Sequence, residues 1–172
     1  MNKPIFWQDT LPSLYRAQGA LMQAPSLTVA LRALGRAFSV RLLHLGASPA
    51  EPLLADGMEA DEAGWFSRDV LLCLDDEPVV WARSQCAVSA CGWRDLLDCG
   101  TRPLGERLFD GSLPLERSAF EYAALDGHTR LAGFDGAALA ARRSFFSLHG
   151  EDLGLVECFL PNLKNYLAHC DG

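Results

Sequence analysis

Two apolar segments joined by a short polar turn occur twice in this chain, and this pattern constrains its fold most strongly. The first pair covers residues 65–74 and 79–84, with DDEP between them. The second covers residues 142–148 and 153–161, with HGED between them. Asp, Gly and Pro are typical of tight turns, and apolar runs of this length are typical of strands. The pattern therefore predicts two antiparallel hairpins.

The rest of the chain predicts short helices and further strands. At 172 residues and 49% apolar composition, it is long enough to bury the core of one domain. We expect a single α+β domain over residues 1–172 on one antiparallel sheet, with an N-terminal arm at 1–25 and a C-terminal tail at 162–172. The expected elements are a helix from Leu27 to Gly35 capped by Ser26, a strand at 38–42, helices at 90–100 and 101–109, and a segment at 115–125 that favours strand over helix.

Composition argues against several classes of protein. The net charge is −7 and the 15 basic residues are scattered, so we expect no nucleic-acid partner. No apolar run is long enough to span a membrane, and the first ten residues lack the apolar centre of a secretion signal, which predicts a cytoplasmic protein.

The six cysteines form no CxxC pair and no His/Cys cluster at zinc spacing. We expect structural thiols and no metal site.

Two charged residues lie on apolar faces of their strands. Side chains alternate along a strand, so Arg68 points with Phe66 and Val70, and Glu157 points with Leu155. An isolated buried charge costs several kcal/mol, so each of the two needs a partner. In one interpretation, the more usual one, they pair with each other. In the other they stand apart, with the arginine fork on a ligand carboxylate and the glutamate, as an acid or base, at a hydroxyl or ether oxygen.

Other arginines are weaker candidates. Arg83 shares an apolar face with Val79 and Trp81, and its expected role is a packed stem with a salt bridge at its tip. Arg142 and Arg143 fall on opposite faces of one strand, so at least one of them is expected to be solvated. The histidines are dispersed, and no Ser-His-Asp or Cys-His arrangement can be proposed.

Several segments together resemble the chorismate pyruvate-lyase family. They occur in the family's order and cover most of the chain from Ser26 to Pro161. The matching segments are SLT at 26–28, RDVLLCLDDEPVVWARS at 68–84, LGERLF at 104–109 after Pro103, RRSFFSLHG at 142–150 and ECFLP at 157–161.

The resemblance implies a fold and a set of site residues. The family has one antiparallel sheet of about six strands with short helices. Its ligand-carboxylate arginine falls on Arg68, and the carboxylate at the ligand hydroxyl falls on Glu157; these two are the catalytic candidates. The positions whose backbone borders the ligand fall on Leu27 and Leu104. We keep Arg83 and Arg143 as secondary candidates.

The resemblance also implies an activity. A chorismate pyruvate-lyase is a carbon–oxygen lyase that eliminates pyruvate from chorismate to give 4-hydroxybenzoate, the first step of ubiquinone biosynthesis. The family uses no metal or other cofactor, its members are typically monomeric, and its partners are the substrate and product. The alternative is a non-catalytic domain that binds a small aromatic acid, because the same fold serves as an effector sensor in transcription regulators.

Overall fold

A single antiparallel sheet forms the centre of the molecule in the computed structural model, which describes residues 4–12, 19–59 and 62–167. The strand order is β1-β2-β3-β7-β6-β4, and β5 also pairs with β6. The prediction of one antiparallel sheet is confirmed, with seven strands instead of about six because the 115–125 segment forms two short ones. The strands are β1 Phe38–Ser48, β2 Trp65–Leu74, β3 Glu77–Ala87, β4 Glu116–Arg117, β5 Glu121–Ala124, β6 Ala140–Leu148 and β7 Glu151–Phe159.

Both predicted hairpins are present. The turn sets the register of β6 and β7 along their whole length, whereas a bulge at Leu72 and Cys73 shifts the register of β2 and β3 by one residue. Asp75 and Asp76, between β2 and β3, have φ of 49° and 66°. His149 and Gly150, between β6 and β7, have φ of 52° and 81°. Positive φ at both central residues is typical of the type I′ turn, whose twist matches that of antiparallel strands. The two hairpins then join through β3 and β7, which pair in the middle of the sheet.

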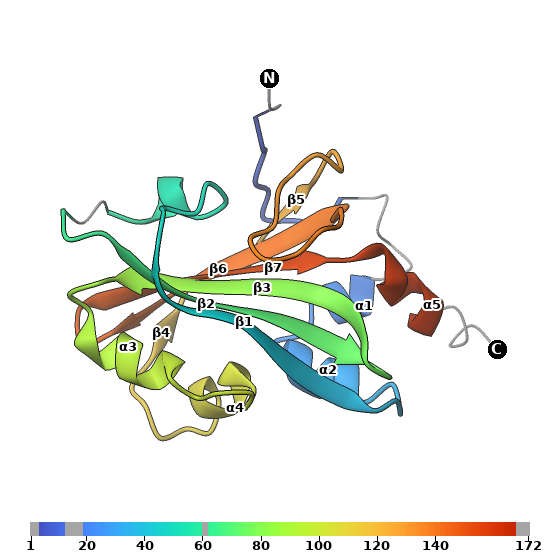
Figure 1. The fold of residues 1–172 in the computed structure, drawn as a ribbon, viewed down its shortest axis with the longest axis horizontal. Helices are drawn as coiled ribbons and strands as arrows, with labels where there is room; N and C mark the ends of the chain where they lie inside the picture. Colours follow the sequence, from blue (N-terminus) through green and yellow to red (C-terminus); the bar gives the residue numbers. More distant parts are fainter. Residues whose placement is uncertain (1–3, 13–18, 60–61, 168–172) are drawn as a thin grey trace.

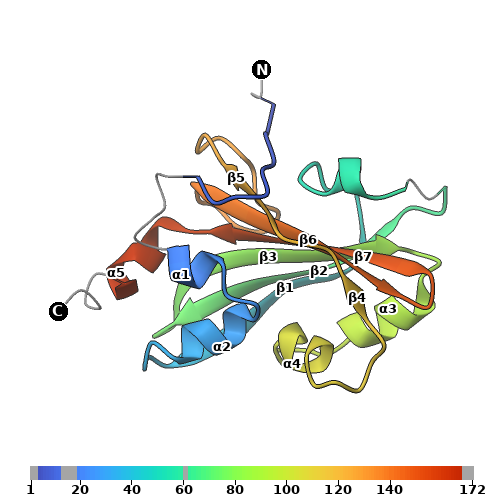
Figure 2. The ribbon, with the colours of Figure 1, turned by 180° about the vertical axis from the view of Figure 1, so that it is seen from behind.

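Short helices cover one face of this sheet. Helices α1 to α4 lie on the same side of the strands in two opposite views (Figures 1 and 2). Ser26 caps α2 as predicted, because its side chain accepts from the backbone N–H of Val29. None of the helices in the described residues is both long and apolar enough to cross a membrane. The helices are α1 Gly19–Met22, α2 Leu27–Arg32, α3 Cys91–Leu97, α4 Leu104–Leu108 and α5 Lys164–Leu167, with 3₁₀ turns η2 at Ala55–Gly57 and η3 at Pro161–Leu163.

The opposite face is covered by the N-terminal segment, the η2 region and the loop after β5 (Figure 1). Gln8 forms an isolated bridge with Tyr122 of β5, which fixes part of the predicted arm on the sheet. Trp81 is fully buried on this side, and its indole N–H donates to the carbonyl of Ala132. Apolar side chains are therefore packed on both sides of the sheet, which explains why its central strands are buried along most of their length.

The cysteines that the structure describes fit the prediction of structural thiols in most positions. Cys73, Cys86, Cys99 and Cys158 are free and buried, and Cys91 is free and exposed. Burial raises the pKa of the Cys86 thiol to about 12, which disfavours the reactive thiolate. Cys170 lies outside the described residues.

Candidate functional site

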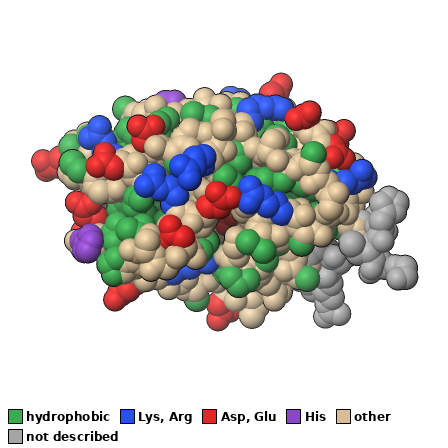
Figure 3. Space-filling view, turned by 90° about the horizontal axis from the view of Figure 1, so that it is seen from below, with side chains coloured by type: hydrophobic (Ala, Val, Ile, Leu, Met, Phe, Trp, Pro, Cys, Tyr) green, Lys and Arg blue, Asp and Glu red, His purple; other side chains and the backbone are tan. Residues whose placement is uncertain are grey.

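A cavity lies between the sheet and the helices α2 and α4. Its floor comes from β1, β2, β3, β6 and β7, one side chain enters from β4, and its rim includes the beginnings of the two helices. Figure 3 shows the molecule from this side, where basic and acidic side chains are interspersed across the middle of the face. The ionisable residues that line the cavity are Arg68, Arg117, Arg142 and Glu157.

Strand register assembles the floor in two rows. Arg68 of β2 is level with Ser84 of β3, which is level with Leu155 of β7. One step along, Val70, Ala82, Glu157 and Arg142 form the next row. Directly opposed residues in antiparallel strands share a face. The alternation that placed Arg68 and Glu157 among apolar neighbours therefore brings both to one cavity.

Arg68 is a buried cation without a carboxylate partner among the described residues. Only 3% of the surface of Arg68 is exposed. Its Nη2 donates to the carbonyls of Gly100 and Arg102, at 3.0 and 2.9 Å, and its buried Nε has no hydrogen-bond partner. Burial lowers the pKa of Arg68, although an arginine stays charged at neutral pH. Two carbonyl dipoles offset the positive charge only in part. The guanidinium can therefore bind an anion as a further partner.

Glu157 is held by a different arginine. Nε of Arg142 donates to Oε1 of Glu157 at 2.8 Å, and both side chains are buried. Nη1 of Arg142 donates to the carbonyls of Met22 and Ala24, at 3.0 and 2.6 Å. Arg142 therefore connects Glu157 to the chain between α1 and α2. Paired in this way, the carboxylate is placed to accept a hydrogen bond from a ligand.

The two interpretations of Arg68 and Glu157 are distinguished by this geometry. Arg68 and Glu157 form no ion pair with each other, because Glu157 pairs with Arg142 instead. The interpretation that Arg68 and Glu157 pair with each other is therefore wrong. They lie two strands apart and one row apart, which corresponds to roughly 12 Å between their Cα atoms from ideal strand spacings. The cation and the carboxylate therefore face the cavity from separate positions.

Leu27 and Leu104 lie at the rim of the cavity. Each is the first residue of its helix, α2 or α4, and each is buried. The first N–H groups of a helix have no partner within the helix. The structure therefore brings together four of the residues named from the sequence: Leu27, Arg68, Leu104 and Glu157.

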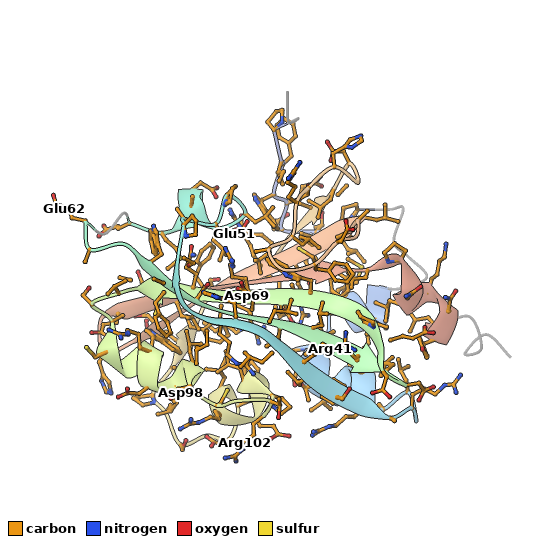
Figure 4. All side chains as sticks on the ribbon, in the orientation of Figure 1. Arg41, Glu51, Glu62, Asp69, Asp98 and Arg102 are labelled. Carbon is orange, nitrogen blue, oxygen red and sulfur yellow. The ribbon has the colours of Figure 1, made fainter. Side chains whose placement is uncertain are left out.

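The two secondary candidates lie on the opposite face. Arg83 makes a two-pronged contact with Asp69, at 2.7 Å for each hydrogen bond, and a further bond of 3.1 Å to Glu51. Figure 4 shows Glu51 and Asp69 on the side of the sheet away from Arg102, which precedes α4. The prediction that Arg83 packs its stem and forms a salt bridge is confirmed, with its guanidinium 5.9 Å from the centre of the Trp81 ring.

Arg143 also points away from the cavity. It bonds Asp56 at 2.6 Å, Glu121 at 3.1 Å and the carbonyl of Leu53 at 2.9 Å. The expectation that Arg142 or Arg143 is solvated is wrong, because both are at most 4% exposed. Each has a carboxylate partner on its own side of the sheet, which offsets the cost of burial.

The sequence did not identify two of the four ionisable residues that line the cavity, Arg117 and Arg142. Arg142 could have been found, because a two-residue turn at His149-Gly150 places it directly opposite Glu157. Arg117 had no such signal, because it lies on the two-residue strand β4 whose partner and register are not encoded locally. In the described part of the chain, no group of three or more His, Cys, Asp or Glu is placed to hold a metal ion.

The cavity is small in this conformation. Its volume is about 60 Å³, whereas an apolar protein cavity that holds benzene has about 150 Å³. An aromatic acid therefore requires lining side chains or the covering helices to move outward. An ion pair joins the two helices that cover the cavity: Arg32 at the end of α2 pairs with Glu106 of α4 at 2.7 Å, and both side chains are substantially exposed.

Comparisons with known proteins agree on one family. The family model described as "Chorismate lyase" matches residues 5–166. A "Probable chorismate pyruvate-lyase" of Ralstonia nicotianae is 37% identical over 178 residues, covering 91% of this chain and 89% of the relative. A "Probable chorismate pyruvate-lyase 1" of Burkholderia pseudomallei is 36% identical, covering 98% and 96%.

The fold has a wider distribution. The effector domain of PhnF from Mycobacterium smegmatis matches with a TM-score of 0.50 and 15% identity, over 80% of this chain and 89% of that domain. At this identity the similarity shows the fold alone.

Proposed function

Because the chain belongs to the chorismate lyase family, a family of lyases, we propose that it eliminates pyruvate from chorismate to give 4-hydroxybenzoate. The observation that carries the proposal is the buried guanidinium of Arg68, which faces a cavity and has no carboxylate partner in the described residues. A guanidinium of this kind is suited to the planar carboxylate of an aromatic acid, which can take two parallel hydrogen bonds.

The reaction requires little from the protein except geometry. Chorismate is a cyclohexadiene with a ring carboxylate, a hydroxyl and an enolpyruvyl ether. The proton leaves the ring carbon that bears the hydroxyl, and its electron pair forms the third ring double bond as the neighbouring ether C–O bond breaks. The enolpyruvyl group departs as the enolate of pyruvate and takes up a proton. Aromatisation drives the step, so holding one conformer away from water is the main task of the site.

The residues of the cavity have separate roles in this proposal. Arg68 binds the ring carboxylate, and the backbone N–H groups at Leu27 and Leu104 add to that anchor. Glu157 accepts a hydrogen bond from the ring hydroxyl at the other end. Arg142 is a positioning residue, because it fixes the carboxylate of Glu157 through the 2.8 Å hydrogen bond.

The direct test is to mix the purified protein with chorismate and follow the ultraviolet absorbance of 4-hydroxybenzoate, after subtracting the uncatalysed rate. We expect turnover by the wild-type chain and its near loss in Glu157→Gln and Arg68→Ala. Activity near wild type in both variants would refute the assigned roles. Binding of 4-hydroxybenzoate without any turnover by the wild-type chain would favour the alternative of a non-catalytic binding domain.

The cellular setting is a further part of the proposal. We propose a cytoplasmic monomer that needs no cofactor and supplies 4-hydroxybenzoate at the first step of ubiquinone synthesis. A strain without this chain should then lose ubiquinone and recover it when 4-hydroxybenzoate is added to the medium. Recovery without the supplement would contradict this setting, and gel filtration would test the oligomeric state.

A further inference from the structure

We propose that Arg117 binds the second carboxylate of the substrate, the one on the enolpyruvyl group that leaves as pyruvate. The inference rests on the proposed function and extends it to a residue that neither the family resemblance nor the strand pattern identified.

Arg117 is a second cation of the cavity without a carboxylate partner among the described residues. It lines the cavity from β4, at the edge of the sheet. Its Nη1 donates to the carbonyl of Pro25 at 2.9 Å, and its Nε is buried without a hydrogen-bond partner. Burial lowers the pKa of Arg117, and the charge of Arg142 lowers it further, yet the guanidinium stays charged at neutral pH.

The charges of the cavity match a dianion. Its ionisable side chains are three arginines and one glutamate. Arg142 is neutralised by Glu157, and its remaining donors are engaged by the carbonyls of Met22 and Ala24. Two positive charges, on Arg68 and Arg117, are left without an anion. Chorismate has two carboxylates, one on the ring and one on the enolpyruvyl group.

The two free guanidinium groups are placed to bind different ends of a molecule. Arg68 lies on β2 and Arg117 on β4, and the strands β3, β7 and β6 separate them in the sheet. Glu157 lies on β7 and so belongs to a strand between the two. Origins on opposite sides of Glu157 favour two separate carboxylates over one that both arginines share, and chorismate has two carboxylates at different places in the molecule.

Aromatic rings surround the guanidinium of Arg117. The carbon of its guanidinium lies 4.1 Å from the ring centre of Phe120, 5.0 Å from that of Phe109 and 5.2 Å from that of Phe146. The guanidinium of Arg142 lies 4.2 Å from the centre of the same Phe120 ring. Contacts of this kind engage the faces of a guanidinium and leave its edge N–H donors for a planar anion.

Loss of pyruvate gives this contact a distinctive consequence. The product 4-hydroxybenzoate keeps only the ring carboxylate, so it has no group for Arg117. Arg117 therefore contributes to binding of the substrate and not to binding of the aromatic product, whereas Arg68 contributes to both.

The test compares three variants, Arg117→Gln, Arg68→Gln and Arg130→Gln, the last an exposed arginine that controls for the loss of one positive charge. For Arg117→Gln we expect kcat/KM for chorismate to fall roughly 10- to 150-fold, the loss of one charged hydrogen-bonding partner. Its Kd for 4-hydroxybenzoate, measured by calorimetry, should stay within about twofold of wild type because the product does not reach it. Arg68→Gln should lower kcat/KM for chorismate and also raise the Kd for 4-hydroxybenzoate. Arg130→Gln should change neither quantity.

Two results would overturn the inference. One is an Arg117→Gln variant with kcat/KM within about twofold of wild type, and the other is an equal loss of affinity for substrate and product. Circular dichroism checks folding, and Arg117→Lys, which keeps the charge without the fork, should recover part of the loss. If the wild-type chain does not convert chorismate, the proposed function fails, and the calorimetric affinities of Arg117→Gln for chorismate and 4-hydroxybenzoate then test Arg117 alone.

Discussion

Arg142 and Glu157 lie directly opposite each other on β6 and β7 and are joined by a 2.8 Å hydrogen bond inside the protein. This pair, and not a pair between Arg68 and Glu157, stabilises the buried carboxylate. It leaves Arg68 free to face the cavity, which is the arrangement that a ligand-binding arginine requires.

Removing one partner of this pair should be costly. In Arg142→Gln the carboxylate of Glu157 stays buried without its cation, so we expect the free energy of unfolding to fall by about 3–5 kcal/mol. Urea denaturation measures the loss. The matched control is Arg36→Gln, which breaks an exposed ion pair with Asp75 and should cost under about 1 kcal/mol.

The double variant Arg142→Gln/Glu157→Gln separates charge from packing. It leaves two neutral amide side chains that can form a hydrogen bond with each other, so part of the lost stability should return. The explanation is wrong if the double variant is as unstable as the sum of the two single variants.

Loss of Arg68 should affect ligand binding more than folding. Arg68→Gln removes the cation that we propose binds the ring carboxylate, and we expect the Kd for 4-hydroxybenzoate to rise roughly 10- to 150-fold. Titration calorimetry gives the affinity, and the melting temperature without ligand reports folding. A Kd within about twofold of wild type would show that another group anchors the product.

The ion pair between Arg32 and Glu106 should slow product release, because it joins α2 and α4, the two helices that cover the cavity and that must separate for a ring to leave. In Glu106→Gln we expect product to leave about two- to fivefold faster, since exposed pairs contribute at most about 1 kcal/mol. Stopped-flow displacement of bound 4-hydroxybenzoate measures the rate.

Salt and charge reversal provide the controls for this prediction. Higher ionic strength should speed release from the wild-type protein and not from Glu106→Gln. The exchanged pair Arg32→Glu/Glu106→Arg should restore slow release. An equal salt effect in wild type and Glu106→Gln would exclude the pair as the cause.

The buried cluster on the opposite face predicts a pH-dependent stability. Burial raises the pKa of the Glu51 carboxyl above its ordinary value, and the nearby charge of Asp69 raises it further. The hydrogen bond from Arg83 and the backbone N–H of Leu53 offset this shift only in part. A carboxyl with a higher pKa in the folded state stabilises the fold when protonated, and this contribution is lost as the pH rises above the unfolded pKa. Glu51→Gln, which resembles the protonated form, should match wild type near pH 4 and become the more stable protein at pH 8.

Asp69→Asn is the contrasting variant. Asp69 makes both short hydrogen bonds to Arg83. We therefore expect the free energy of unfolding of Asp69→Asn to be about 3–5 kcal/mol lower than that of wild type at pH 8. Urea denaturation at the two pH values measures both variants. The account of the cluster fails if Glu51→Gln is less stable than wild type at pH 8.

The sequence by itself determined the local parts of this protein. Period-two alternation placed Arg68 and Glu157 on apolar faces, and the turn residues at Asp75-Asp76 and His149-Gly150 set the two hairpins. These features depend on neighbours along the chain, and the register of β6 and β7 follows from their turn, whereas a bulge shifts that of β2 and β3. The same rule would also have placed Arg142 opposite Glu157.

Only the tertiary structure decided which charges meet. β3 pairs with β7 across a long sequence separation, and this pairing puts Arg68 and Glu157 on one floor but two strands apart. Arg83 and Arg143 looked similar in sequence, yet they face the other side and bind carboxylates there. Arg117 entered the cavity through a two-residue strand at the sheet edge. The cost of burying a charge depends on partners from distant segments, and strand alternation carries no information about those partners.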